Sequence, residues 1–108
     1  MNKQGQFYQG DIRCMYVNEI PANAVPVKPQ AGRYIIAEGE ATGHHHAIDE
    51  KFGKLFETPD GTLWLRVAES PAPMMHEEHA PVTFEPGRIV RFDQQCQETA
   101  GDVYRVRD

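Results

Sequence analysis

The sequence predicts an all-β fold, namely a small single-domain β-barrel or sandwich of about eight short antiparallel strands with little helix. Three observations lead to this prediction. Apolar residues recur with a period of two over several short stretches, as they do on strands with one buried face. The chain of 108 residues contains 8 prolines and 9 glycines, which favour turns over long helices. Asp-Gly and Pro-Gly pairs separate several alternating stretches and are typical of tight turns.

Turns divide the first half of the chain into short strands. In the first of them Ile12, Cys14 and Tyr16 share one face, and a proline-rich crossing follows. The strands are expected at residues 12–17, 33–40 and 44–48. The turns before them are expected at Gly10-Asp11, Ala31-Gly32 and Thr42-Gly43. A helical turn is expected at residues 49–54.

The second half contains the most strongly marked hairpin. Its strands, residues 54–57 and 62–68, flank the sequence Thr-Pro-Asp-Gly at 58–61. Alternation along the second strand should separate two sets of side chains, Leu63, Leu65 and Val67 against Trp64 and Arg66. Further strands are expected at residues 82–84, 88–92 and 103–107, with a tight turn at Glu85-Pro86-Gly87.

Composition limits the class of protein. A chain that is 40% hydrophobic and 25% charged is ordinary for a globular domain, and we expect one domain over residues 1–108. The sequence has no apolar run long enough to span a membrane and no signal peptide at its start, which predicts a cytoplasmic protein. The net charge of −5 argues against a nucleic-acid partner. Edge strands in a small β domain would allow a homodimer.

Cys14 and Cys96 are the two cysteines, 82 positions apart. We expect two free thiols, because a disulfide would require export to an oxidising compartment. The C-terminal arginines are interpreted as charges on solvated strand faces, namely Arg88, Arg91, Arg105 and Arg107.

All five histidines lie in two stretches, residues 44–46 and 76–79. Lys and Arg are absent from residues 34–50 and 67–87, and these two windows contain eight of the 16 Asp and Glu residues. Histidines surrounded by carboxylates and remote from cations are typical of a metal site.

The first stretch reads as one half of such a site. His44 and His46 would point to the same face of a strand, about 6.6 Å apart at ~3.3 Å per residue. Two imidazoles at this spacing can reach one ion through bonds of about 2.0–2.1 Å. Ile48 shares their face and indicates that it is the inward one, whereas His45 should point the other way.

The conformation of the second stretch, His-Glu-Glu-His at 76–79, decides which of its side chains act together. An extended segment places Glu77 with His79, whereas a helical turn places His76 with His79. Nearby prolines favour the extended form, and the helical HExxH motif of zinc proteases is not matched.

These residues predict a site for a divalent transition metal, either Zn, Fe, Mn, Ni or Cu. The ligands are expected to be His44, His46 and His79, with His76 in the same metal site in a supporting position. The fourth ligand or the general base is expected to be Glu50 or Glu77. An open coordination position would bind a small polar molecule for Lewis-acid chemistry, and hydrolysis, isomerisation and oxygen chemistry all stay open.

Other interpretations stay open beside this one. The imidazoles and carboxylates would also suit a metal-free hydrogen-bonded pocket. As a surface cluster they would suit a non-enzymatic interaction module, from a phage or an accessory gene, that binds its partner around Trp64 or a sheet edge. A metal-responsive or pH-responsive regulator is a further alternative, because histidine titrates near neutrality.

The stretch Gly-His-His-His-Ala-Ile-Asp-Glu at 43–50 resembles the first half of the cupin signature. The matching residues are His44, His46 and Glu50, preceded by Gly39 and Gly43. Cupins are small β-barrels that bind a divalent metal through three histidines and a glutamate, so the resemblance implies a cupin-like metal site. The second half departs from the signature, because Pro86 and Gly87 are adjacent and the histidine position holds Val90.

The overall layout is also similar to a set of small uncharacterised bacterial and phage proteins. The shared segments are Gly10–Ile12, Gly43–His46, His76–Pro81 and Pro86-Gly87. The resemblance implies that the two histidine stretches belong to one site.

Overall fold

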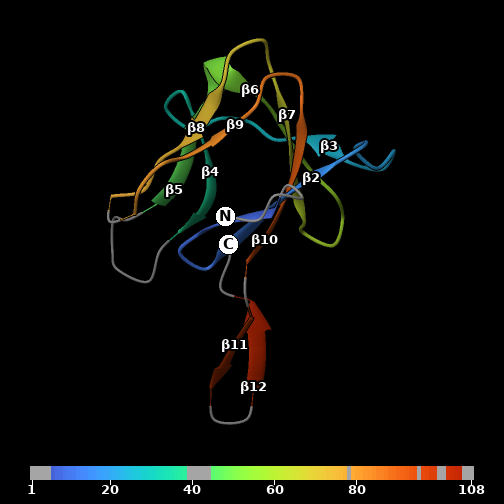
Figure 1. Cartoon of the computed structure of the whole chain (residues 1–108). Coiled ribbons are helices and arrows are strands. Elements are labelled where there is room, and N and C mark those ends of the chain that lie inside the picture. Colours follow the sequence, from blue (N-terminus) through green and yellow to red (C-terminus); the bar gives the residue numbers. More distant parts are fainter. Residues whose placement is uncertain (1–5, 39–44, 78, 95, 100–101, 106–108) are drawn as a thin grey trace.

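The computed structural model describes residues 6–38, 45–77, 79–94, 96–99 and 102–105 (Figure 1). Strands are the main secondary structure of the described part, which also contains one short 3-10 turn, η1 (Glu50–Phe52). This confirms the predicted all-β class and the helical turn expected at 49–54. The strands are β1 (Gln6–Gln9), β2 (Ile12–Val17), β3 (Val25–Pro26), β4 (Arg33–Glu38), β5 (His45–Asp49), β6 (Gly53–Glu57), β7 (Leu63–Val67), β8 (Ala72–Met74), β9 (Val82–Phe84), β10 (Ile89–Gln94), β11 (Cys96–Thr99) and β12 (Asp102–Arg105).

The strands form two layers around one core. One layer is a six-stranded antiparallel sheet with the order β1-β2-β10-β7-β6-β3. The pairs β4–β5 and β8–β9 lie on the other side of the core (Figure 1). Ala47 of β5 joins these pairs by exchanging backbone hydrogen bonds of 3.0 and 2.8 Å with Met75. The hydrogen-bonded strands of the described part do not close into a barrel, so the sandwich form of the prediction applies.

The core lies between the layers and draws on both. The six-stranded sheet contributes Ile12, Cys14, Leu55, Leu65 and Val90, and the facing pairs contribute Ile36, Ile48, Met74 and Phe84. Each of these side chains is at least 96% buried, and complete burial of one large apolar side chain stabilises a fold by about 1.5–3 kcal/mol. Phe84 also makes edge-to-face contacts with three other rings, those of Phe7, Tyr16 and Phe92.

The hairpin β6–β7 has the turn that the sequence predicts. Backbone N–H groups of Thr58 and Gly61 donate to Thr62 O and Thr58 O, at 3.0 and 2.8 Å. The Thr58 hydroxyl donates to Asp60 Oδ1 at 2.7 Å, and this hydrogen bond lowers the pKa of the Asp60 carboxyl. Alternation also holds in β7, where the inward side chains are buried and the outward ones are exposed or half-buried.

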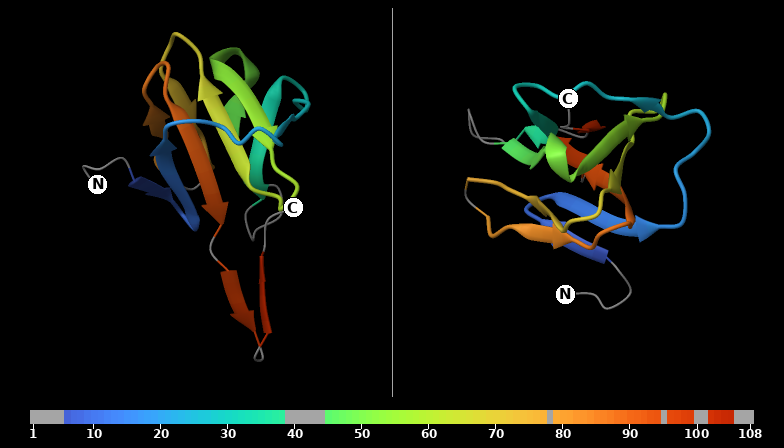
Figure 2. Two further views of the ribbon diagram at one scale, coloured as in Figure 1. Left: turned by 90° about the vertical axis from the view of Figure 1, so that its right-hand side faces the viewer. Right: turned by 90° about the horizontal axis from the view of Figure 1, so that it is seen from above.

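Four strands were not expected from the sequence: β1, β3, β8 and β11. β8 contains Pro73, which suggested a break in the strand pattern. Proline has no N–H to donate to a neighbouring strand, but it is tolerated at a strand position where no such hydrogen bond is needed. β11 and β12 form a hairpin that extends away from the two layers (Figures 1 and 2). Of the expected elements, the Thr42-Gly43 turn lies outside the described residues. Within the described ranges, no helix is both long and apolar enough to cross a membrane.

Candidate functional site

Three segments that are distant in sequence meet where β5 begins and β8 ends. They are the β1–β2 turn at residues 9–11, the first residues of β5, and the connection from β8 to β9. Side-chain hydrogen bonds and ring contacts join all three, and they bring His46, His76 and His79 together. Both histidine stretches therefore contribute described residues to one cluster.

His46 is the innermost member of the cluster. It is only 2% exposed, on the same face of β5 as the buried Ile48, as the alternation predicts. Burial, and after it the neighbouring His76, lowers the pKa of His46 to about 4, whereas Asp11 opposes this effect. The imidazole of His46 is therefore neutral at pH 7.

Gln9 determines which nitrogen of His46 carries the proton. The Nε2 of Gln9 lies 2.8 Å from Met74 O and 2.9 Å from Ala80 O, so this end of the amide must be the donating NH₂ group. The opposite end, Oε1, lies 2.8 Å from His46 Nδ1 and can only accept. His46 Nδ1 must therefore be the protonated nitrogen, which leaves the lone pair on Nε2.

The lone-pair nitrogen of His46 faces a carboxylate. Its Nε2 lies 3.8 Å from Oδ1 of Asp11, in the β1–β2 turn. The ring of His76 lies between the other two, with centroids 4.3 Å from His46 and 4.6 Å from His79, and the outer pair is 6.2 Å apart. Three imidazoles and one carboxylate thus lie close together at this end of β5.

Gly10 allows this close approach. Its φ of +59° at the first central position of the two-residue β1–β2 turn is typical of a type II′ hairpin. A Cβ at this position would lie 2.8 Å from Nε2 of His79 and 3.4 Å from Cε1 of His46. The backbone conformation therefore favours glycine here, and a Cβ would require the His79 ring to move from its observed position.

Glu77 and His45 form the rim of the cluster. The backbone N–H of His45 donates to Oε1 of Glu77 at 3.0 Å, which ties the start of β5 to the β8–β9 connection. The His45 side chain is half-buried, and its Nδ1 is buried without a hydrogen-bond partner among the described residues.

The positions of the candidate site residues differ in part from those expected from the sequence. The extended conformation expected at 76–79 is wrong for the described residues of this segment, because the chain bends at Glu77 and at His79. His76, expected in a supporting position, consequently lies in the middle of the ring cluster. Glu50 follows the far end of β5, about 13 Å from His46 at ~3.3 Å per residue. His44 lies outside the described residues.

Three contributors were missed from the sequence, Gln9, Gly10 and Asp11. The pair Gly10-Asp11 was identified as a turn and as part of a shared segment but not as part of the site, because its proximity to the histidines depends on the long-range packing of the strands. Gln9 is neither a common metal ligand nor a common base, so residue type alone could not single it out. The sequence signal that could have identified Asp11 is an acidic residue in a tight turn of a chain whose histidines are clustered.

The distances between the donor atoms of the cluster can be compared with those that a bound metal ion requires. Among the described residues, no group of three or more His, Cys, Asp or Glu side chains is arranged as a ready metal site. In a tetrahedral site with bonds of about 2.0–2.1 Å, donor atoms lie roughly 3.3 Å apart, somewhat closer than the 3.8 Å between His46 Nε2 and Asp11 Oδ1. The residue types fit, but convergence requires rotation of the outer side chains. His76 is half-buried and His79 is exposed, so both have room to turn.

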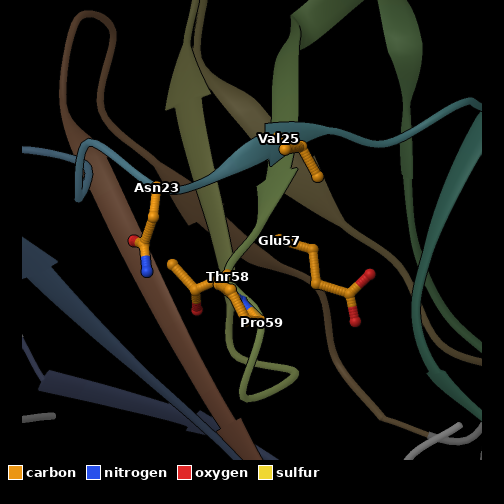
Figure 3. A pocket seen from close by; sticks show the side chains of 5 residues that line it. All are labelled: Asn23, Val25, Glu57, Thr58 and Pro59. Atoms are coloured by element: carbon orange, nitrogen blue, oxygen red, sulfur yellow. The ribbon is translucent and has the colours of Figure 1, made fainter.

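A separate recess lies beside the β6–β7 turn (Figure 3). It has a volume of about 270 Å³ and no histidine in its lining, which consists of Asn23, Val25, Glu57, Thr58 and Pro59. The recess is therefore distinct from the histidine cluster.

Comparison with known proteins adds a family but no activity. No curated protein and no solved structure matches the chain. Residues 8–94 match a family described as a domain of unknown function, DUF8820, and this span includes the entire histidine cluster. The chain therefore belongs to the DUF8820 family.

Proposed function

We propose that this protein binds one divalent transition-metal ion through His46, His76 and His79, with the carboxylate of Asp11 as a fourth ligand. The observation that carries the proposal is the orientation of His46. Gln9 holds the proton on Nδ1, and the remaining nitrogen faces Oδ1 of Asp11 at 3.8 Å.

A positive charge between these two atoms would relieve an unfavourable arrangement. A nitrogen lone pair and a carboxylate oxygen are both acceptors, so they cannot bond to each other directly and need a donor or a cation between them. Burial lowers the pKa of His46 to about 4, which makes a proton on Nε2 unfavourable at neutral pH. A metal ion would supply the charge and would also bind the imidazoles of His76 and His79.

The polar contacts of His46 are those expected of a metal ligand. Histidine ligands commonly donate their second ring N–H to a neighbouring acceptor, which orients the ring and sets the tautomer. Gln9 Oε1 has this position relative to His46. Three imidazoles and a carboxylate suit zinc, and imidazole donors also suit iron, nickel and copper.

The carboxylates predicted as bases have different places in this proposal. Glu77 lies at the rim of the cluster with one oxygen bonded to His45 N–H, and its role as a general base stays a prediction. Glu50 lies beyond the far end of β5, so we propose no role for it in metal binding.

Metal titration of the metal-free protein tests the proposal. Protein without a histidine tag is titrated with Zn²⁺ by calorimetry and with Co²⁺ by visible absorption, which responds to nitrogen ligands. We expect about one equivalent to bind, and His76→Gln and His79→Gln each to weaken binding by roughly tenfold or more, equivalent to ~1.4 kcal/mol. Glu50→Gln is the control and should bind like the wild type.

Two results would contradict the proposal. One is no binding of either metal by the folded wild-type protein. The other is binding that neither His76→Gln nor His79→Gln changes. The first result would leave the cluster as a hydrogen-bonded polar network and would favour the non-enzymatic interaction module. A loss of binding in His44→Ala would add His44 to the ligands, as the sequence predicts.

A further inference from the structure

We infer that Gln9 is a positioning residue with two separate tasks: its amide oxygen sets the tautomer of His46, and its amide NH₂ group holds the loop that carries His76 and His79. The consequence for metal affinity rests on the proposed function. The two tasks themselves do not, because each is a property of the metal-free protein.

The NH₂ group of Gln9 closes a loop. Its acceptors are the carbonyl oxygens of Met74 and Ala80, at 2.8 and 2.9 Å. Met74 ends β8, and Ala80 precedes β9, so the two carbonyls flank the connection that carries both outer histidines. A single side chain from β1 therefore fastens both ends of this connection.

All polar atoms of the Gln9 amide are used in this arrangement. The two N–H bonds donate to the two carbonyls, and the oxygen accepts from His46. Gln9 is 2% exposed, so water cannot readily replace a lost partner. Leaving one such buried group without a partner costs about 1–3 kcal/mol, and the arrangement therefore resists reorientation of the amide.

No other side chain of similar length performs both tasks. Glutamate retains an acceptor for His46 Nδ1–H but has no N–H for Met74 O and Ala80 O. Methionine has similar length and fills the space without a comparable donor or acceptor. The variants Gln9→Glu and Gln9→Met therefore separate the two tasks.

The test uses long-range ¹H–¹⁵N NMR of the metal-free protein, which distinguishes imidazoles protonated on Nδ1 from those protonated on Nε2. In the wild type and in Gln9→Glu, His46 should be protonated on Nδ1. In Gln9→Met this preference should be lost. Amide hydrogen exchange at Glu77 and His79 should accelerate in both variants, because the loop is released in each. Gln6→Met, at a half-buried glutamine of the same strand, is the control and should resemble the wild type.

Zinc titration then links the inference to metal binding. Loss of groups that orient metal ligands commonly weakens binding by about 10–100-fold, and we expect this range for Gln9→Met, which loses the acceptor for His46 as well as the hold on the loop. The inference is overturned by a wild-type His46 protonated on Nε2, which requires no variant to fold. It is also overturned if Gln9→Met retains the wild-type tautomer and loop exchange.

The two proposals can fail separately. A wild-type protein that binds no zinc but has His46 protonated on Nδ1 would remove the metal site and leave the role of Gln9. A wild-type protein that binds zinc while Gln9→Met retains its affinity, tautomer and loop exchange would remove only the role of Gln9.

Discussion

Gly10 lies beside the imidazole of His79, although 69 positions separate them in the chain. A Cβ on residue 10 would lie 2.8 Å from Nε2 of His79, and φ at this position is +59°. The β1–β2 turn therefore limits where the outermost ring of the cluster can lie. This relationship can be tested by adding a single methyl group.

Gly10→Ala should destabilise the fold and displace His79. The left-handed conformation costs an alanine about 1–2 kcal/mol, and the added Cβ meets the imidazole. Gly87→Ala is a matched control, because Gly87 has φ of +76° but a Cβ added there would meet no atom within 4 Å. Both variants should have a lower free energy of unfolding in urea, but only Gly10→Ala should shift the NMR signals of His79. Unchanged His79 signals in Gly10→Ala would contradict the contact.

Acid should destabilise the metal-free protein through His46. Its folded pKa of about 4 lies below the ordinary value near 6.5, so the unfolded chain takes up a proton first as the pH falls. The contribution of neutral His46 to the free energy of unfolding is therefore fully present above about pH 6.5. It is lost between about pH 6.5 and 4, and its size is on the order of 3 kcal/mol. Urea unfolding at several pH values should show a shallower pH dependence for His46→Leu than for the wild type. Parallel curves would contradict the prediction.

The thiol of Cys14 should be unreactive in the folded protein. It is completely buried, and burial together with the nearby charge of Asp93 raises its pKa to about 12. Only the thiolate reacts rapidly with disulfide reagents. In a Cys96→Ser variant, the remaining thiol should react slowly in native buffer and rapidly in denaturant. Equal rates in both would place Cys14 at the surface.

The same pKa shift predicts an effect of alkali on stability. Because the folded pKa of Cys14 is raised above the ordinary value of 9.0, its contribution is fully present below that value and is lost as the pH rises towards 12. Cys14→Ala should remove this part of the alkaline destabilisation, measured by urea unfolding at increasing pH. The prediction would be contradicted if the free energy of unfolding fell equally with rising pH in the wild type and in Cys14→Ala.

Thr58 should stabilise the β6–β7 hairpin. Its hydroxyl donates to Asp60 Oδ1 at 2.7 Å and accepts from Trp64 Nε1 at 3.2 Å. Thr58→Val keeps the shape but removes both interactions, so we expect a loss of about 1–2 kcal/mol and a shift in fluorescence of the single tryptophan. Thr83→Val, at an exposed position of β9, is the control and should change neither property. A Thr58→Val variant as stable as the wild type would contradict the role of this turn.

Local features of the sequence predicted most of the strands. Alternation identified β2 with its observed bounds, and turn chemistry identified the β6–β7 hairpin together with the inward face of β7. These predictions succeeded because a strand and a tight turn depend on neighbouring residues. β8 was missed because its proline was taken as a break, although its position in a two-stranded pair tolerates one.

For the candidate site, the sequence by itself determined the residue types and one orientation. It identified the two histidine stretches and placed His46 on the buried face of its strand, because side-chain direction in a strand follows from a period of two. The tertiary structure decided which groups accompany it. The bends at Glu77 and His79 moved His76 into the ring cluster, and the β1–β2 turn brought Gln9, Gly10 and Asp11 beside it. These contacts join segments separated by more than 30 positions, so they depend on how the two layers pack and not on any local pattern.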